Sequence, residues 1–229
     1  MYLPVNRNSV RHTRTKVICD FDGTVTLFDT TDALLERFAL PEWEDVEKKW
    51  LSGSITSREC MERQIAMIHA KRQELDAYID TFESTPGFKE FVNFCDQSDL
   101  DLHIVSDGID YTIHRVLSNI GLLNIPVFAN HLVFMEKGYG LTFPFAKDDC
   151  RFGMCKCDVA DIGNGETILI GDSYSDTCIA GMASTVYAVR GKPLELYCIE
   201  KGIAHIPFCD FYNILAELKH QPNRKRMKT

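Results

Sequence analysis

A short apolar run that ends in two acidic residues limits the fold of this chain more than any other feature. The run is residues 16–19, Lys-Val-Ile-Cys, and Asp20, Phe21, Asp22 and Gly23 follow it directly. Alternate side chains of a strand lie on one face, so extended backbone through Asp20 and Asp22 would place both carboxylates in one site. Two adjacent carboxylates repel, and their burial is costly without a cation or a shared proton. The pattern therefore predicts a buried strand with a divalent cation at its end.

Two further apolar runs end in polar clusters. Residues 102–105 lead into Ser106, Asp107 and Gly108, and residues 166–170 lead into Gly-Asp-Ser-Tyr-Ser-Asp at 171–176. Ligands of parallel sheets bind beyond the carboxyl ends of the strands. We therefore expect the three clusters, although far apart in sequence, to meet at one crevice.

Strand patterns alternate with helical patterns over most of the chain, which indicates an α/β fold with a doubly wound, mostly parallel sheet. The predicted strands are residues 15–20, 102–105, 127–134, 140–143, 166–170, 185–189 and 203–206, with 127–134 and 140–143 forming a hairpin. The predicted helices of this part are residues 88–95, 110–120, 175–182, 193–201 and 211–218.

Residues 30–85 carry helical patterns and no convincing strand. Thr56-Ser-Arg-Glu, for example, is a capping-box pattern that opens a helix predicted to run through residue 68. We therefore predict a helical cap over residues 30–85, inserted into a catalytic core of residues 1–29 and 86–220. A basic tail, residues 221–229, follows the core.

Composition limits the partners that the protein can have. The formal net charge of −8 argues against a general nucleic-acid binder, because such a protein needs a basic face. No apolar run approaches the roughly 20 residues of a membrane span. We expect a cytoplasmic protein that acts on a small metabolite and binds neither nucleic acid nor membrane; whether it forms a homodimer stays open.

The cysteine content is unusual. Nine cysteines without a secretory context indicate reduced thiols rather than a disulfide framework. Cys150, Cys155 and Cys157 form a local cluster, but their spacing is only loosely similar to the paired knuckles of zinc sites. Whether this cluster binds a metal stays open.

The predicted crevice has the groups that phosphate-ester hydrolysis needs. Asp20 can act as the nucleophile, and Asp22 can protonate the leaving group and then deprotonate water. Asp172 would complete an oxygen-rich Mg2+ site. Backbone amides near Gly23, Asp107 and Gly108 offer donors for phosphate oxygens.

The remaining groups each have an alternative interpretation. Ser106 offers a hydroxyl to the phosphate, but a serine at this position is also a common turn residue. Lys156 is the preferred cation, with Lys147 as the alternative. Asp176 suits metal binding or helix capping, and the two roles are compatible.

These four segments together resemble the motifs of haloacid dehalogenase superfamily phosphatases with a helical cap. The matching residues are Asp20-Phe-Asp-Gly-Thr, Ser106, Lys156 and Gly171-Asp172-Ser-Tyr-Ser-Asp176. The resemblance implies a nucleophilic Asp20, an acid/base Asp22, and phosphate ligands Ser106 and Lys156. It also implies Mg2+ held by the Asp20 side chain, the Asp22 backbone carbonyl and Asp172, with support from Asp176.

Within the superfamily the chain is most similar to methionine-salvage phosphatases that act on 2-hydroxy-3-keto-5-methylthiopentenyl-1-phosphate. The similarity lies in Asp29-Thr-Thr-Asp-Ala-Leu-Leu, Ser57-Arg-Glu-Cys-Met, Ser106-Asp-Gly and Gly153-Met-Cys-Lys. Phosphoserine phosphatases are more distant, because they usually carry glycine where Asp107 stands and a cap arginine where Glu62 stands.

The expected activity is therefore Mg2+-dependent hydrolysis of a small phosphorylated metabolite through an aspartyl-phosphate. Alternatives of the same class are phosphoserine and phosphoethanolamine, whose ammonium group Asp29 could hold. An alternative of another class is a signalling receiver domain that is phosphorylated on Asp20. In the cap, Trp43, Trp50, Arg58 and Arg63 are specificity candidates, although tryptophans at heptad spacing more often mark a packing face.

Overall fold

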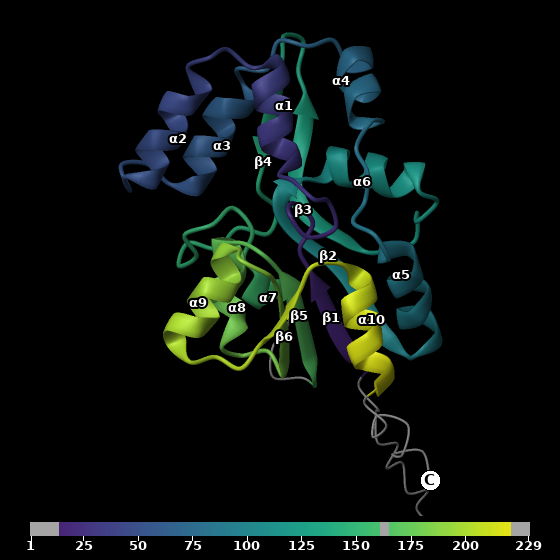
Figure 1. Cartoon of the computed structure of the whole chain (residues 1–229). Coiled ribbons are helices and arrows are strands. Elements are labelled where there is room, and N and C mark those ends of the chain that lie inside the picture. The colour runs from purple at the N-terminus through teal and green to yellow at the C-terminus, as the bar shows by residue number, and fades with distance from the viewer. Residues whose placement is uncertain (1–13, 161–164, 221–229) are drawn as a thin grey trace, which may run out of the picture.

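The computed structural model describes residues 14–160 and 165–220; the predicted tail at 221–229 lies outside this range. A seven-stranded sheet of order β4-β3-β2-β1-β5-β6-β7 forms the core (Figure 1). Every neighbouring pair is parallel except β3 and β4, which form the predicted antiparallel hairpin. The predicted α/β class and doubly wound sheet are confirmed.

The strands and helices have the following bounds. The strands are β1 Thr15–Cys19, β2 Leu100–Ile109, β3 Val127–Phe134, β4 Tyr139–Thr142, β5 Thr167–Gly171, β6 Thr185–Val189 and β7 Ile206–Phe208. The helices are α1 Thr30–Phe38, α2 Trp43–Leu51, α3 Ser57–Ile65, α4 Arg72–Ile79, α5 Phe88–Gln97, α6 Asp110–Asn119, α7 Lys156–Ala160, α8 Thr177–Ala180, α9 Pro193–Lys201 and α10 Phe211–His220, with a 3₁₀ turn, η1, at Tyr174–Asp176.

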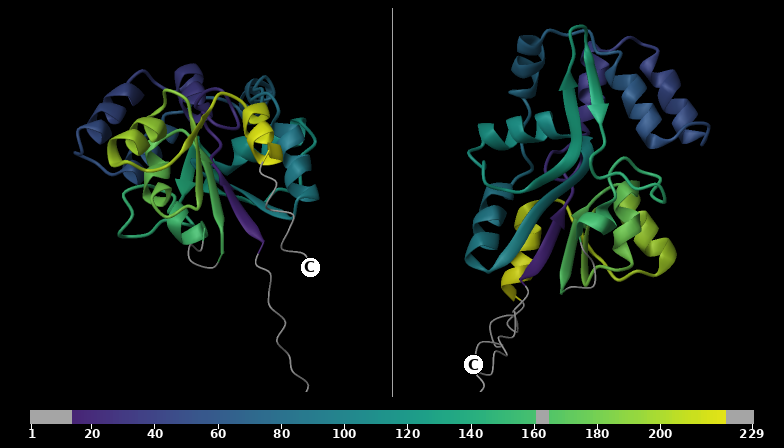
Figure 2. Two further views of the ribbon diagram at one scale, coloured as in Figure 1. Left: turned by 60° about the horizontal axis from the view of Figure 1, so that its bottom comes forward. Right: turned by 180° about the vertical axis from the view of Figure 1, so that it is seen from behind.

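Helices cover both faces of the sheet, as the two views of Figure 2 show. Val17 and Cys19 of β1 pack in one buried cluster with α5, α6 and α10. Ile18, between them, packs in a second buried cluster with α7, α8 and α9. A central strand that is buried on both faces needs a continuous apolar run, which explains the Val-Ile-Cys sequence of β1.

Some predicted boundaries were displaced by tertiary contacts. The strand expected at 102–105 extends over 100–109, and the helix expected at 175–182 is a 3₁₀ turn followed by the short helix α8. The last strand was expected at 203–206 and lies at 206–208 instead, because Phe208 is buried against Phe211 of α10. Pro207 is tolerated there since β7 is an edge strand.

The segment predicted as a cap lies beyond the carboxyl ends of the central strands. In Figure 1, α1, α2 and α3 stand together, whereas α4 lies apart from α2 and α3. Arg115 of α6 binds Asp80 at the end of α4 through two contacts of 2.7 Å, so α4 is joined to a helix of the predicted core. Tyr139 of β4 donates to the carbonyl of Ala70, 2.8 Å away, and thereby ties the hairpin to the same segment. The boundary at residues 30–85 stays a prediction.

Across the described residues, no helix combines the length and the apolar character that a membrane crossing requires.

Candidate active site

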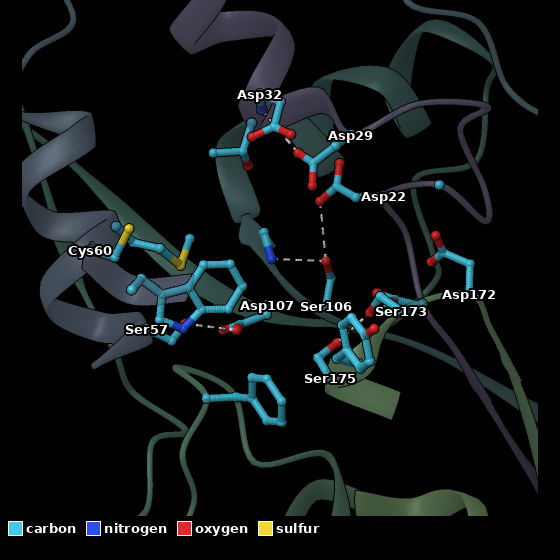
Figure 3. A pocket seen from close by; sticks show the side chains of 18 of the residues that line it. Asp22, Asp29, Asp32, Ser57, Cys60, Ser106, Asp107, Asp172, Ser173 and Ser175 are labelled. Carbon is cyan, nitrogen blue, oxygen red and sulfur yellow. Dashed lines mark hydrogen bonds between the residues drawn. The ribbon is translucent and has the colours of Figure 1, made fainter. Parts of the chain in front are cut away.

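The predicted polar clusters meet at one edge of the sheet. β1 lies between β2 and β5, so Asp20, Ser106 and Asp172 reach the same region from three neighbouring strands. Figure 3 shows Asp22, Ser106, Asp107 and Asp172 around one pocket. Parallel alignment of the strands brings these residues together, because it places their carboxyl ends side by side.

Lys156 lies at the base of this site, between two acidic residues. Its Nζ is 2.7 Å from Asp20 Oδ2 and 2.7 Å from Asp176 Oδ1, and all three side chains are at most 4% exposed. Burial opposes its charged form, but the carboxylates of Asp176 and Asp20 raise the pKa of Lys156, so the lysine is an ammonium ion. Lys147, the alternative cation, instead pairs with Asp158 at 3.2 Å and is about half exposed.

Asp176 connects Lys156 to the backbone that follows β5. Its Oδ1 accepts from Lys156, and its Oδ2 accepts from the backbone amides of Asp172 (3.1 Å) and Ser173 (3.0 Å). Both oxygens therefore have protein partners. This arrangement suits the supporting role that the resemblance implies for Asp176 better than direct coordination of an ion.

The donor set fits a hard divalent cation. Carboxylate oxygens of Asp20, Asp172 and Asp176 lie within 4.8 Å of one another. Burial and then the Asp176 carboxylate raise the pKa of Asp172 to about 7, and the same two causes raise the pKa of Asp20. The charge of Lys156 thus does not offset the effect of burial on the pKa values of Asp20 and Asp172. Mg2+, which prefers oxygen ligands, would supply the missing charge, with Asp20 and Asp172 as its side-chain ligands.

Gly23 allows Asp172 to approach the backbone of the first polar cluster. Its φ of +70° is the left-handed conformation that glycine adopts readily. A Cβ at this position would lie 2.3 Å from Asp172 Oδ2. Thr24, the next residue, donates its hydroxyl to Asp172 Oδ1 at 3.2 Å. The turn after Asp22 therefore positions Asp172.

The Asp22 side chain is directed toward the start of α1 and toward Ser106. Its Oδ1 accepts from the amide (2.8 Å) and the hydroxyl (2.5 Å) of Thr30, and Ser106 Oγ lies 3.5 Å from its Oδ2. Burial and then the nearby Asp29 carboxylate raise the pKa of Asp22 to about 8. A pKa of about 8 favours the protonated form of Asp22 at neutral pH, which is the form that a general acid requires.

The second cluster provides one hydroxyl and one carboxylate. Ser106 is buried, and its Oγ accepts from the amide of Gly108 at 3.0 Å, which fixes the hydroxyl at the site. Asp107 lines the pocket, but its carboxylate accepts hydrogen bonds from Asn130, Met154 and Ser57. Its side chain therefore serves contacts within the protein.

The pocket between the core and α1–α3 has a volume of about 340 Å³. Helices α1–α3 and the residue before α1 contribute three acidic residues, Asp29, Asp32 and Glu47, and an apolar surface that includes Trp50 and Met61. Phe152 of the core also lines it. Trp50 thus faces the pocket, although its spacing suggested a packing role.

The two cap arginines that the sequence suggested are not among the lining residues; Arg63 pairs with Glu59 instead. Lys192, which precedes α9, does line the pocket, and sequence reasoning missed it. Its position after β6 and directly before the helix-starting Pro193 is a signal that could have identified it.

The cysteines form no metal-binding group in the part of the chain described here. The group of candidate ligands found in residues 14–160 and 165–220 is the acidic one, and it contains no cysteine. All nine cysteines are free thiols.

This fold and this arrangement of acidic residues define a haloacid dehalogenase-like hydrolase. The model of that family matches residues 17–180, and the chain belongs to the family. A relative from Exiguobacterium sp. is 36% identical over 217 residues, which cover 90% of this chain and 97% of the relative. A relative from Brevibacillus brevis is 32% identical over 89% of this chain and 94% of its own length.

Both relatives are named 2-hydroxy-3-keto-5-methylthiopentenyl-1-phosphate phosphatase. The present chain is accordingly a phosphoric monoester hydrolase.

Two solved structures share its fold. One is a phosphoserine phosphohydrolase-like protein from Francisella tularensis, with a TM-score of 0.67 and 22% identity. The match covers 89% of this chain and 99% of that protein. A phosphoserine phosphatase in a phospho-aspartyl intermediate analogue form has a TM-score of 0.69 at 17% identity, over 90% of this chain and 99% of its own.

Proposed function

We propose that the protein is a Mg2+-dependent phosphomonoesterase that works through an aspartyl-phosphate on Asp20. The observation that carries this proposal is the position of Asp20. Its carboxylate stands at the end of the central strand, 2.7 Å from Lys156 and in one group with Asp172. Its Oδ1 accepts from the amide of Phe21 at 2.8 Å, which fixes the orientation of the carboxylate.

The two half-reactions use the same pair of residues. In the first, an Asp20 oxygen attacks phosphorus, the bond to the leaving oxygen breaks, and Asp22 gives that oxygen its proton. In the second, Asp22 takes a proton from water, which attacks phosphorus and releases phosphate from Asp20. Lys156 and Ser106 bind the phosphoryl oxygens. Mg2+ bound by Asp20 and Asp172 would supply positive charge that stabilises the negative charge on the phosphoryl oxygens during transfer.

We propose the substrate named for the relatives, 2-hydroxy-3-keto-5-methylthiopentenyl-1-phosphate. Trp50, Met61 and Phe152 offer an apolar surface for the methylthio end, because sulfur and aromatic rings attract each other. No arginine of the described residues lines the pocket, whereas Asp29, Asp32 and Glu47 line it beyond the phosphate site. A substrate with its own carboxylate, such as phosphoserine, would be repelled by these acidic residues.

A second candidate is an ammonium-bearing ester such as phosphoethanolamine. Asp29, Asp32 and Glu47, at the start of α1 and on α2, would attract the ammonium group. A comparison of kcat/KM for the three esters separates the candidates. We expect the methylthio ester to be hydrolysed best and phosphoserine worst; a preference for phosphoethanolamine would favour the second candidate.

The mechanism is tested with Asp20→Asn. This change should lower turnover of a generic aryl phosphate by a factor on the order of 10⁴ or more, because it removes the nucleophile. The circular dichroism spectrum should stay that of the wild type. Asp96→Asn, an exposed position on α5, serves as the matched control. Wild-type turnover by Asp20→Asn would refute Asp20 as the nucleophile.

A further inference from the structure

We propose that Asp107 is a positioning residue whose two carboxylate oxygens join the cap helix α3 to the loop that carries Lys156. The proposal rests on the phosphatase chemistry proposed above but not on the identity of the metabolite. Asp107 stands between Ser106 and Gly108, where the phosphoserine phosphatases that the chain resembles usually have glycine. Its carboxylate is therefore a difference from phosphoserine phosphatases.

One oxygen holds the loop before Lys156. Asp107 Oδ1 accepts from the amide of Met154 at 2.9 Å. A Cβ on Gly153 would lie 2.7 Å from the same oxygen, so the loop can approach this closely only with glycine at 153. Lys156 begins α7 two residues after Met154, and its Nζ contacts Asp20. Asp107 thus helps to set where the lysine enters the site.

Asn130 fixes Asp107 from the neighbouring strand β3. Its Nδ2 donates to Asp107 Oδ1 at 3.1 Å and to the backbone carbonyl of Asp107 at 2.6 Å. Asn130 is fully buried, which makes these contacts costly to lose. The Oδ1 contacts all come from β3 and the Lys156 loop, and none comes from the cap.

The other oxygen faces the cap. Ser57 Oγ donates to Asp107 Oδ2 across 3.3 Å, and Figure 3 shows this pair at the pocket. Ser57 is the first residue of α3, whose N-terminal end carries partial positive charge and favours a carboxylate there. Opening of the cap would break this hydrogen bond and leave the Oδ1 contacts intact. The two functions of Asp107 can therefore be separated by mutation.

The experiment uses Ser57→Ala, which removes only the cap contact, and Asp107→Asn, which weakens both. Ser54→Ala is the matched control, because Ser54 is an exposed serine of the same segment that bonds only Ser52 among its side-chain contacts. Binding of orthovanadate with Mg2+ is followed by tryptophan fluorescence. Both tryptophans of the chain lie on α2, and Trp50 lines the pocket, so the signal reports on the cap.

We expect Ser57→Ala to weaken vanadate binding about tenfold and to raise KM for an aryl phosphate similarly, with kcat within about twofold. The tenfold estimate follows because the hydrogen bond from Ser57 to the Asp107 carboxylate stabilises the closed position of α3, and a bond to a charged group contributes about 1.5 kcal/mol or more. Asp107→Asn should raise KM and also lower kcat about tenfold, since the Lys156 loop shifts. In the Asp107→Asn background, Ser57→Ala should have no further effect beyond about twofold.

Two results would overturn the proposal. One is a Ser57→Ala enzyme that binds vanadate as tightly as Ser54→Ala; the other is full additivity in the double variant. Loss of the proposed Asp20 mechanism would appear differently, as normal turnover by Asp20→Asn, so the two failures are distinguishable.

Discussion

Replacement of Lys156 by methionine tests the charge arrangement at the centre of the site. Methionine keeps much of the volume of the lysine chain but removes the ammonium group. The change leaves Asp20 and Asp176 buried without the partner that now lies 2.7 Å from each. Since neither carboxylate is more than 4% exposed, water cannot replace the lost contact.

The expected loss follows from this burial. Removal of one partner from a buried ion pair destabilises a protein by about 3–5 kcal/mol. Burial and then the Asp176 carboxylate already raise the pKa of Asp20, which favours the lower end of this range, about 3 kcal/mol. For a chain of this length that loss lowers Tm by roughly 6–12 °C. The loss should shrink as the pH falls, because protonation removes the unpaired charge.

Urea unfolding without Mg2+, at pH 7.5 and pH 5, measures the free energy of unfolding. Lys147→Met is the matched control, because this exposed lysine pairs with Asp158 at 3.2 Å. Its replacement should lower the free energy of unfolding by less than about 1 kcal/mol. Turnover of an aryl phosphate should fall by about 10²–10³ in Lys156→Met, since one positive contact to the phosphoryl group is lost, and stay unchanged in Lys147→Met. Equal stability and activity of the two variants would refute the assignment of Lys156.

Two other predictions concern the metal site. Gly23→Ala should abolish Mg2+-dependent activity, because its Cβ would meet Asp172 Oδ2 at 2.3 Å. The control is Gly53→Ala, at a similar φ of +75° but with no atom within 4 Å of the added Cβ. It should lower the free energy of unfolding by only about 1 kcal/mol and keep activity. Wild-type activity in Gly23→Ala would contradict this. The pKa values of Asp22 (about 8) and Asp172 (about 7) lie above the ordinary 3.8, so the folded metal-free protein holds protons that the unfolded chain releases. The stability of the metal-free protein should therefore fall as pH rises from about 4 to 8. Mg2+ at 100 times its Kd should raise Tm by roughly 5–10 °C at pH 8. The shift should be smaller at pH 5.5, because protons then compete with the ion for the carboxylates. Equal Mg2+ shifts at both pH values, measured by scanning fluorimetry, would contradict the linkage.

Much of the fold could be predicted because its signals are local. The apolar runs at 16–19 and 166–170 are followed directly by Asp20 and by the 171–176 cluster, so strand positions and the functional edge of the sheet can be inferred together. The Thr56 cap of α3 is also local, since its hydroxyl accepts from Glu59 three residues later. Patterns of this kind depend on neighbours along the chain.

The side-chain partners of the site depend on contacts between distant segments. The sequence favours Lys156 and leaves Lys147 as the alternative. Packing of α7 decides between them, because it buries Lys156 and leaves Lys147 about half exposed. Trp50 has the spacing of a packing residue, yet the position of α2 turns it to the pocket.

The sequence by itself determined the α/β class, the three acidic or hydroxyl clusters at strand ends and the kinship with capped phosphatases. Only the tertiary structure decided that Asp107 faces Ser57, from a helix 50 residues earlier in the chain, and that Asp176 accepts from Lys156 rather than standing free. The physical reason is that periodicity states which face of an element is apolar. Which polar group meets which across a junction is decided by how the elements pack.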